Sequence, residues 1–549
     1  MGVKPSSTSS KSALRPRRKS ALRPVGFAPL LAGFTLSGCM VGPDYVPPPA
    51  VTPEKFKELK GNLVKGWKLA APRDCVDAGP WWKVYNDPTL DALEAQVEIS
   101  NQSVAAAAEA YEQARTLVRE AEAALFPTVT SAYNVTRQHT GKALVGGFPI
   151  SPAATPALAS PNTVSLHGQT SAIYTPRADL VWEIDIWGKI RRQIESNVAA
   201  AQVSAADLEN AKLTAQATLA AAYFNRRAAV SLRELLDRTA QEYRKTLEIV
   251  RNQYKIGLAA RADVDAAETQ LVAAEAQAIS TGVQIAQLEH AIAVLIGRPP
   301  TELSLPTAGL VGGIPAVPVE VPSALLERRP DIAAAERLMQ QENALIGVAV
   351  AAYYPDITLS ATFGYTGFVP LPINPAHEFW SLAATATQTI FEGGLRSAQV
   401  DSATATYRQS VANYRQTVIA AFQQVEDQLA ALRIGRQQLE TQERAVAAAR
   451  NSLNFYLNQY RVGWVAFTSV VVAEAELFAT EQSVLTTRQN LFVASVALIE
   501  SLGGGWDRSK LPTPAQATPP ISIFPQDPAA TPPPPPPQLK EEAACCGGQ

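Results

Sequence analysis

The sequence predicts a mixed α+β membrane protein in which one plan is used twice. The first observation is an internal duplication: NQYKIGLAARADVDAAETQL at Asn252–Leu271 recurs as NQYRVGWVAFTSVVVAEAEL at Asn458–Leu477. Nine of these 20 aligned pairs are identical, and the same register relates 188–297 to 394–503. The second observation is a long helical periodicity in each copy, and the third is a pair of short alternating segments in each copy.

Length and composition narrow the class of protein. At 549 residues the chain exceeds the size at which a single core stops growing, so several domains or a repeat architecture are expected. The formal net charge is −2 and the basic residues are dispersed beyond Arg23, so no nucleic-acid-binding face is expected. The sequence lacks G-x-S-x-G, H-E-x-x-H and P-loop motifs, so we expect no enzyme and no cofactor.

The cysteines and histidines indicate no metal site. The four histidines are far apart in the sequence, and the four cysteines stand in contexts too different for a disulfide framework or a metal knuckle. The cysteines are Cys39, Cys75, Cys545 and Cys546. Only Cys39 has a context that suggests a role.

The N-terminus predicts a lipoprotein signal peptide over residues 1–38. A Lys- and Arg-containing stretch precedes an apolar run at 25–36, which is shorter than the about 20 residues that span a bilayer. The LSGC sequence that follows resembles a bacterial lipobox, which would make Cys39 the first mature residue and lipidate it. A plain buried or free cysteine is the alternative. Met40 rather than Asp at the next position implies sorting to the outer membrane, and a Pro-rich tether follows within 39–88.

The first copy is expected to occupy residues 89–297. A helical pattern from Thr89 to Leu125 ends at Phe126-Pro127, because the residue before a proline is disfavoured in helices. A β-hairpin is expected at about 127–187, with a long loop rich in Gly, Pro, Ala and Ser. A long helical hairpin is then expected over 188–297.

The second copy repeats this plan over residues 323–506, after a linker at 298–322. Its first helix runs from Asp331 to Tyr354, its β-hairpin covers about 355–392, and its helical hairpin covers 394–503. The remaining 507–549 is Pro-rich and is expected to be disordered.

Strict alternation predicts the strands. One side of each expected strand is apolar and the other polar, a pattern typical of membrane-barrel strands of about 9 to 11 residues. A half-solvated soluble hairpin is the alternative. The expected apolar sides are Val129, Ser131, Tyr133 and Val135; Leu180, Trp182, Ile184 and Ile186; Ile357, Leu359, Ala361, Phe363 and Tyr365; and Trp380, Leu382, Ala384 and Ala386.

In each helical hairpin, apolar or small residues recur every three or four positions, and this spacing predicts helices that wind around their neighbours. Each such row of residues is called a seam. Glycines at positions 257 and 463 stand where each hairpin must reverse, so we expect them to end helices there. The descending seam is Leu232, Leu235, Leu236, Thr239, Tyr243, Leu247, Val250 and Tyr254; the returning seam is Val264, Ala267, Leu271, Ala274, Ala278, Thr281, Ile285, Leu288, Ile292 and Leu295.

Four strands cannot close a barrel in lipid, where every strand edge must be paired. Copies of the chain must therefore pool their strands. A dimer, a trimer or a tetramer would each satisfy this requirement.

Several motifs together resemble the outer membrane factors of bacterial tripartite efflux pumps, the TolC-like superfamily, and in particular its NodT-type lipoproteins. These are the LSGCMVGPDYVPP start, WEIDIWGKIRR at 182–192, FEGGLRS at 391–397, and the YxxG turns at Tyr254 and Tyr460. The resemblance covers about residues 39–506. It implies a homotrimer with a twelve-stranded outer-membrane barrel, a coiled-coil α-barrel reaching across the periplasm, and an equatorial belt formed by the chain ends and the linker.

The resemblance also implies partners: a periplasmic adaptor and an inner-membrane pump, most often a proton-driven one of the resistance-nodulation-division class. In that family the hairpin tips dock the adaptor. The matching residues here are Gly257, Leu258, Gly463 and Trp464.

A periplasmic gate is also implied by the resemblance. In some relatives an acid matching Asp263 is tied to a tyrosine matching Tyr460, although Asp263 could equally be a helix cap. Ser469 and Val472 replace the acids of the second turn, so an acidic constriction must come from Asp263 or Asp265, or be absent.

The leading functional hypothesis is a passive exit duct for small molecules, driven by the partner pump. A type I protein-secretion duct is a second hypothesis, and the lipobox and NodT-like motifs argue against it. A periplasmic coiled-coil lipoprotein without a pore is the third. The exported substrate is not specified by the sequence.

Overall fold

The computed structural model describes residues 40–49, 53, 56–58, 80–140, 169–315 and 325–521. The expected signal peptide, the lipidation residue Cys39 and the long loop of the first β-hairpin lie outside the described residues, as do Cys75, Cys545 and Cys546.

The described chain follows the same order of elements twice. The first copy contains α1 (Pro88–Ser100), α2 (Gln102–Ala123), β1 (Thr128–Thr140), β2 (Gln169–Glu183), α3 (Lys189–Lys255) and α4 (Arg261–Leu295). The second contains α5 (Leu325–Arg328), α6 (Pro330–Ala351), β3 (Asp356–Tyr365), β4 (Glu378–Thr387), α7 (Leu395–Arg461) and α8 (Phe467–Ser501). Shorter elements are η1 (Trp81–Tyr85), η2 (Pro300–Glu302), η4 (Pro375–His377), η5 (Arg508–Lys510) and α9 (Pro514–Ala517).

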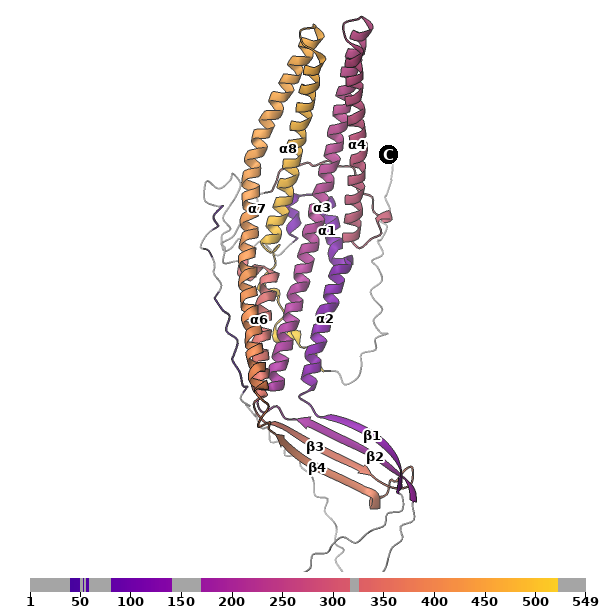
Figure 1. Cartoon of the computed structure of the whole chain (residues 1–549), viewed down its shortest axis with the longest axis vertical. Helices are drawn as coiled ribbons and strands as arrows, with labels where there is room; N and C mark the ends of the chain where they lie inside the picture. The colour runs from indigo at the N-terminus through magenta and orange to yellow at the C-terminus, as the bar shows by residue number, and fades with distance from the viewer. Residues whose placement is uncertain are drawn as a thin grey trace, which may run out of the picture. The chain divides into compact units, whose positions relative to one another are not determined.

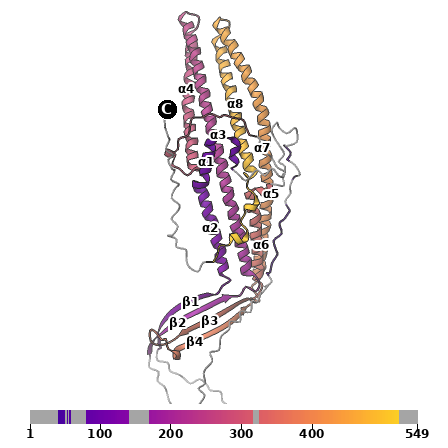
Figure 2. The same cartoon turned by 180° about the vertical axis from the view of Figure 1, so that it is seen from behind.

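The two longest helices, α3 and α7, contact most of the other helices. α3 and α7 are each 67 residues long, which is about 100 Å at 1.5 Å per residue. α3 packs against α4 and α8 in one half and against α2 and α6 in the other, while α7 packs against α8 and α6 (Figure 1). Seen from behind, the α3–α4 and α7–α8 hairpins lie side by side and each ends in a tight turn (Figure 2).

The predicted seams form the contacts between these helices. The α4 seam is buried or half-buried at all of its positions. On α3 the seam is buried from Leu235 to Val250, whereas Tyr254 is 44% exposed, so the prediction was wrong at that residue. Tyr254 lies at the turn, where its carbonyl accepts a hydrogen bond from Gly257 N at 3.0 Å.

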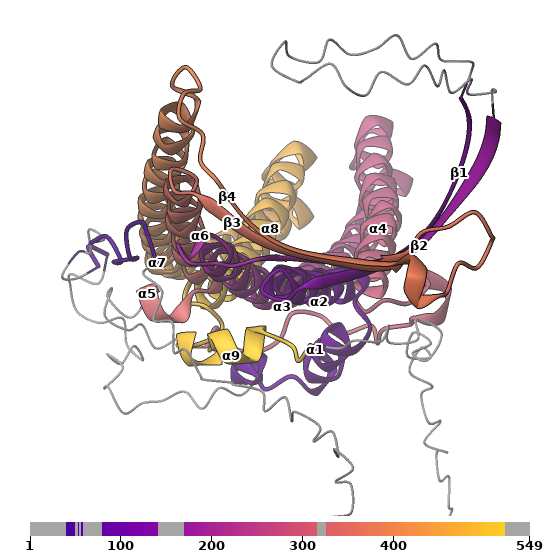
Figure 3. The same cartoon turned by 90° about the horizontal axis from the view of Figure 1, so that it is seen from below.

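The strands form one antiparallel sheet in the order β1-β2-β3-β4. The sheet is curved across its strands (Figure 3). Its two outermost strands, β1 and β4, pair with one neighbour each among the described residues. The strand predictions are confirmed with one correction, since β2 ends at Glu183 and Ile184–Ile186 lie outside it.

Asp185 shows why the strand ends early. Asp185 lies between Ile184 and Ile186 in the stretch expected to be strand, but its carboxylate accepts hydrogen bonds from the backbone N–H groups of Ile190 and Arg191 at 3.1 and 3.0 Å. These are orphan donors in the first turn of α3, so Asp185 acts as a helix cap.

The predicted single helix from Thr89 to Leu125 is two helices, α1 and α2. Asn101 lies between them in an extended conformation, and its side chain accepts hydrogen bonds from Ser103 N and Val104 N. An asparagine N-cap can therefore start a new helix without a proline or glycine to mark it.

The tail departs from the expected disorder over 507–521. Asp507 caps η5, Gln202 Nε2 donates to the carbonyl of Pro512 at 2.8 Å, and Ala517 is fully buried against α2 and α3. Residues 507–521 are thus ordered because they cover apolar surface of the helices.

Within the described ranges, every helix is too short or too polar to cross a membrane.

Candidate functional site

The sheet has one apolar and one polar face, because successive side chains of a strand point to opposite sides. The paired registers place the predicted apolar residues that lie within the four strands on one face. On the other face Arg177 and Asp179 form an ion pair at 3.0 Å, and Thr362 Oγ1 donates to Asp179 at 2.8 Å. The polar face can therefore border water while the apolar face borders lipid.

Aromatic rings stand where the sheet meets the helices. Trp182 Nε1 donates to the carbonyl of Leu125, and Trp187 Nε1 donates to the carbonyl of Pro355, both at 2.9 Å. The Trp187 ring stacks on Tyr354 with centroids 4.7 Å apart. Such amphipathic rings are typical of a membrane–water interface.

The residues directly after the expected lipidation site are fixed at this same junction. Val41 N donates to Trp187 O at 3.1 Å. The buried Arg192 donates to the carbonyls of Val41 and Gly42 and pairs with Asp44 at 2.8 Å. No local signal in the sequence indicates this role for Arg192, because Val41, Gly42 and Asp44 lie about 150 positions away.

The two helical hairpins end in turns with the same geometry. At the first tip Leu258 N donates to Gln253 O at 2.9 Å, and Gly257 has φ +77°. At the second tip Trp464 N donates to Gln459 O at 2.9 Å, and the glycine at 463 has φ +80°. These are Schellman-type ends, which need a left-handed residue and so favour glycine.

Both tips present large apolar side chains to solvent. Ile256 and Leu258 are 70% and 76% exposed, and Val462 and Trp464 are 63% and 79% exposed. Apolar groups grouped in this way mark an interaction surface.

The two acids near the first tip are engaged locally. Asp263 Oδ2 accepts a hydrogen bond from Ala260 N at 3.1 Å, at the start of α4. Asp265 pairs with Arg261 one turn away at 2.9 Å. Asp263 therefore caps its own helix, the alternative to a link with Tyr460.

Tyr460 lies close to Asp263 without a hydrogen bond to it. The tyrosine is 7% exposed, packs on Phe467 with ring centroids 5.4 Å apart, and its hydroxyl has no partner. Burial raises the pKa of Tyr460, and the charge of Asp263 adds to this rise. Ser469 takes the place of Asp263 in the second copy, so α8 starts without a carboxylate cap. Val472, in the next turn of α8, is 67% exposed.

A buried carboxyl group joins the two hairpins below the tips. Glu474 of α8 is 4% exposed and accepts a hydrogen bond from Thr246 Oγ1 of α3 at 2.7 Å. Burial raises the pKa of Glu474 to about 7, and the nearby Glu242 adds to the rise. At its duplicate position, Glu268 is exposed and pairs with Arg251 at 3.1 Å.

The ends of α4 and α8 form two equivalent junctions, because each end faces the start of a helix from the same copy, α2 and α6 respectively. Asn101 Nδ2 donates to Leu295 O at the end of α4, at 2.7 Å. Arg329 Nη1 donates to Ser501 O at the end of α8, at 2.9 Å. A Cβ on the glycine that follows α8, Gly503, would lie 2.0 Å from a backbone oxygen of the facing segment. The side-chain donors thus satisfy carbonyls that a helix end leaves unpaired.

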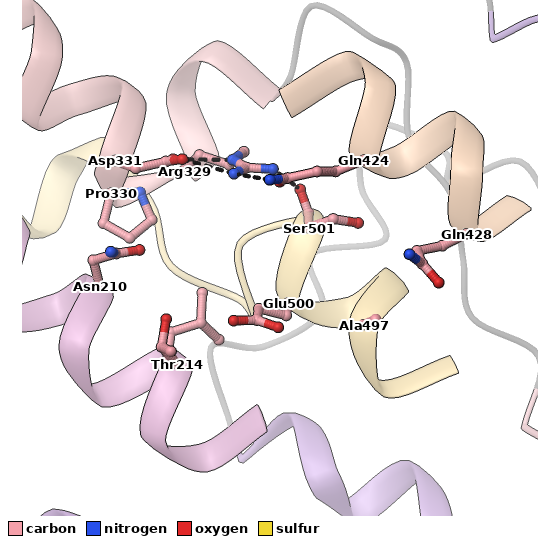
Figure 4. A pocket seen from close by; sticks show the side chains of 11 residues that line it. Asn210, Thr214, Arg329, Pro330, Asp331, Gln424, Gln428, Ala497, Glu500 and Ser501 are labelled. Atoms are coloured by element: carbon pink, nitrogen blue, oxygen red, sulfur yellow. Dashed lines mark hydrogen bonds and ion pairs between the residues drawn. The ribbon is translucent and has the colours of Figure 1, made fainter. Parts of the chain in front are cut away.

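A polar cavity of about 340 Å³ adjoins the second junction. Arg329 donates to Asp331, Gln424 and Ser501 on one side of it, while Thr214 and Glu500 face it from α3 and α8 (Figure 4). Burial raises the pKa of Glu500. The first junction carries Val294 in place of Glu500, so the duplication is not chemically symmetric here.

The first copy has a buried acid of its own. Glu94 on α1 is fully buried, and neither carboxyl oxygen has a hydrogen-bond partner. Burial raises the pKa of Glu94 to about 9, with a further contribution from Glu98. Glu94 is therefore a neutral acid at pH 7.

Among the described residues, no group of three or more His, Cys, Asp or Glu side chains is arranged to hold a metal ion.

The family model described as "Outer membrane efflux protein" matches residues 93–298 and 321–504, more than half of the chain. The chain belongs to the outer membrane efflux protein family. The matched ranges contain the sheet, both helical hairpins and both junctions described above. This confirms the resemblance seen in the sequence motifs.

Two curated relatives of this efflux protein illustrate the range of its similarity. It is 30% identical over 492 residues to the solvent efflux pump outer membrane protein SrpC of Pseudomonas putida, covering 88% of this chain and 98% of that protein. It is 26% identical over 479 residues to the probable outer membrane lipoprotein SilC of Salmonella typhimurium, covering 86% and 97%.

Solved structures agree with the fold. The outer-membrane channel OprN superposes with a TM-score of 0.74 at 27% identity, over 85% of this chain and all of that chain. The open-state MtrE outer membrane channel of Neisseria gonorrhoeae superposes with a TM-score of 0.69 at 26% identity, over 86% and 99%. The mixed α+β fold of an outer-membrane efflux protein is thereby confirmed.

Proposed function

We propose that this chain is the outer-membrane channel subunit of a tripartite efflux pump, a passive exit duct for small molecules without chemistry of its own. The observation that carries this proposal is a sheet with one lipid-compatible and one water-compatible face, joined directly to two long helical hairpins. A conduit needs both properties in one body. The names of its relatives, which include antibiotic and solvent pump components, support small molecules as cargo.

The barrel is proposed to close as a homotrimer of twelve strands. A sheet of four strands leaves the outer edges of β1 and β4 to be paired, and an unpaired edge in lipid costs several kcal/mol per backbone group. Copies of the chain supply the missing partners. Mass measurement of the detergent-solubilised protein tests the number, and a monomeric mature protein would defeat the proposal.

The apolar tips are proposed to dock a periplasmic adaptor, which in turn couples the channel to an inner-membrane pump of the resistance-nodulation-division class. A photo-crosslinker placed at Leu258 or Trp464 should capture a co-encoded adaptor. The same label at the exposed Lys245, further along α3, serves as the control. Equal capture at all three sites would remove the tips from the docking surface.

The periplasmic gate is proposed to lie at Asp263, Asp265 and Tyr460. Their support is position: Asp263 and Asp265 begin α4, and Tyr460 is within electrostatic reach of Asp263 from the other hairpin. A helix cap contributes about 0.5 to 2 kcal/mol, which is small enough for an adaptor to overcome.

Lipidation is proposed at Cys39, with residues 1–38 as the removed signal peptide. Docking of Val41 and Gly42 at the Trp187 end of the sheet supports it, because an acyl chain one or two residues earlier would then reach the inner leaflet. Labelling with radioactive palmitate should mark the wild type and not Cys39→Ser.

We also propose that the mature chain is divided into a tether and equatorial segment at 39–88, two repeats at 89–297 and 323–506, and a linker between the repeats at 298–322. The tail proper is proposed to begin after Ile521, since 507–521 packs on the helices.

Two measurements test the function. Deletion of the gene should sensitise cells to small toxicants, and the purified protein should conduct ions in planar bilayers. Loss of a secreted protein without sensitisation would favour a type I secretion duct. No conductance and no heat-modifiable, β-rich oligomer would favour a scaffold without a pore.

A further inference from the structure

The loop that joins β3 to β4 has an unusual composition for a segment at the outer end of a barrel. Residues 366–377, TGFVPLPINPAH, contain no Asp, Glu, Lys or Arg and include three prolines. Four large apolar side chains on it are solvent-exposed in the isolated chain. These are Phe368 at 73%, Val369 at 55%, Leu371 at 72% and Ile373 at 67%.

The loop is ordered by contacts that hold its apolar groups outward. Gly367 continues the β3 register by pairing with Tyr174 of β2, through hydrogen bonds of 2.8 and 3.1 Å. Thr366 N donates to His377 O at 2.9 Å, and Asn374 caps the short η4. The prolines restrict the backbone further, so little conformational entropy remains to let the exposed groups collapse inward.

A single hydrogen bond fixes the side of the sheet on which the loop lies. The hydroxyl of Tyr133 on β1 donates to the carbonyl of Pro370, so the loop crosses β2 to reach β1. Tyr133 has the strand parity of Val129 and Val135, which places its ring on the apolar face. The loop is therefore held on the lipid side of the sheet, away from the polar face.

The height of the loop can be compared with the aromatic rings. Trp182 marks the inner interface, and Tyr174 is eight residues away on the same face of β2. At about 3.3 Å per residue and the usual tilt of about 40°, the two rings stand about 20 Å apart along the membrane normal. That is close to the about 25 Å apolar band of an outer-membrane barrel, so Tyr174 lies near the outer interface. Phe368 follows the residue paired with Tyr174 and lies at the same level.

From these observations we propose that residues 368–373 form a lipid-binding flap, whose apolar side chains enter the outer leaflet of the outer membrane around the barrel. The occupant is lipid because the patch continues the apolar face of the sheet, carries no charge and lies at the level of Tyr174, near the outer interface. A loop that closed the pore would have to cross to the polar face instead. This inference rests on the proposed membrane-spanning barrel.

The test uses an environment-sensitive fluorophore on single cysteines in the full-length channel. Cys75, Cys545 and Cys546 are replaced by serine and Cys39 is retained; the label is then placed at Leu371→Cys, with Phe368→Cys as a second site. The protein is reconstituted in vesicles of phosphatidylcholine and phosphatidylglycerol. Some vesicles carry lipids with a nitroxide quencher near the headgroup, and others carry it at the end of the acyl chain.

Two neighbouring control positions in the middle of β4 calibrate the result. Leu382→Cys lies on the apolar face, and Ser381→Cys lies on the polar face. We expect the label at Leu371 to show a blue-shifted emission, quenching by the headgroup nitroxide and protection from aqueous iodide, as at Leu382. Quenching by iodide alone at both loop sites, as at Ser381, would overturn the lipid-binding flap.

Conductance of the same preparations tests the proposed channel function separately from the lipid-binding flap. A conducting channel whose loop labels respond only to iodide refutes the flap and leaves the proposed function intact. A preparation that does not conduct at all counts against the channel itself.

Discussion

The buried Glu474 should make the packing of the two helical hairpins depend on pH. Burial raises its pKa from 4.5 to about 7, so ionising it in the folded protein is unfavourable. The protonated form and its stabilisation are fully present below pH 4.5 and are lost as the pH rises through about 7. At about 1.4 kcal/mol per pH unit, the raised pKa corresponds to about 3 kcal/mol as an upper value.

Glu474→Gln removes this dependence and keeps an oxygen that can accept the hydrogen bond from Thr246. We expect the variant to be more stable than the wild type at pH 8, by up to about 3 kcal/mol, and nearly equal to it at about pH 4. Hydrogen exchange of the tip halves of α3 and α8, corrected for the intrinsic rate at each pH, measures the change where it should occur.

The duplication provides the matched control. Glu268→Gln makes the same substitution in the same register, but this side chain is exposed and paired with Arg251, so its effect should be within about 0.5 kcal/mol at either pH. If Glu474→Gln shows the same pH dependence of exchange as the wild type, the buried carboxyl does not control the hairpin contact.

Three further predictions concern single positions. Gly503→Ala should prevent assembly, because the added Cβ would lie 2.0 Å from a backbone oxygen. At Gly505 an added Cβ meets nothing within 4 Å, so Gly505→Ala should only add backbone strain of about 1–2 kcal/mol. The amount of heat-modifiable oligomer on gels measures the effect of both substitutions. Arg192→Ala should release residues 40–49 to limited proteolysis, since it removes hydrogen bonds to two backbone carbonyls and costs about 1–3 kcal/mol. Asp263→Ala should raise single-channel conductance by loosening the start of α4, while Tyr460→Phe should not, because the tyrosine hydroxyl has no partner to lose.

Controls sharpen these three predictions. Arg233→Ala alters an exposed arginine on the same helix as Arg192 and should leave the proteolysis pattern unchanged. A rise in conductance for Tyr460→Phe equal to that of Asp263→Ala would restore a direct gate link between the two residues. Normal assembly of Gly503→Ala would show that the second helix junction can shift to accept a methyl group.

The sequence was sufficient for elements whose cause is local or periodic. The helical seams, the strand alternation and the turns at Gly257 and Gly463 follow from side-chain spacing and from the need for a left-handed residue. Asn101 was a missed signal of the same kind, because its side chain alone is enough to begin α2. Asp185 was misassigned to a strand because an acid fits the alternation and the cap equally well.

Burial across distant segments could not be read from the sequence. Glu268 and Glu474 are identical in type and register, yet one is exposed and the other is buried against α3. The difference arises because α8 packs on both α7 and α3, whereas α4 packs mainly on α3 among the described residues. For the same reason Arg192 gave no sign that it would hold the segment at Val41.

Corresponding helices of the two copies have equal lengths, and these lengths set the distance between the sheet and both hairpin turns. α3 and α7 have 67 residues each, and α4 and α8 have 35 each, so both turns arrive at one level. Removing one heptad from a single helix would offset its turn by about 10 Å and shift its seam against its neighbours. A change in the distance to be bridged between two membranes would thus require coordinated insertions or deletions in all four helices. Relatives adapted to a wider or narrower gap should differ by such matched sets.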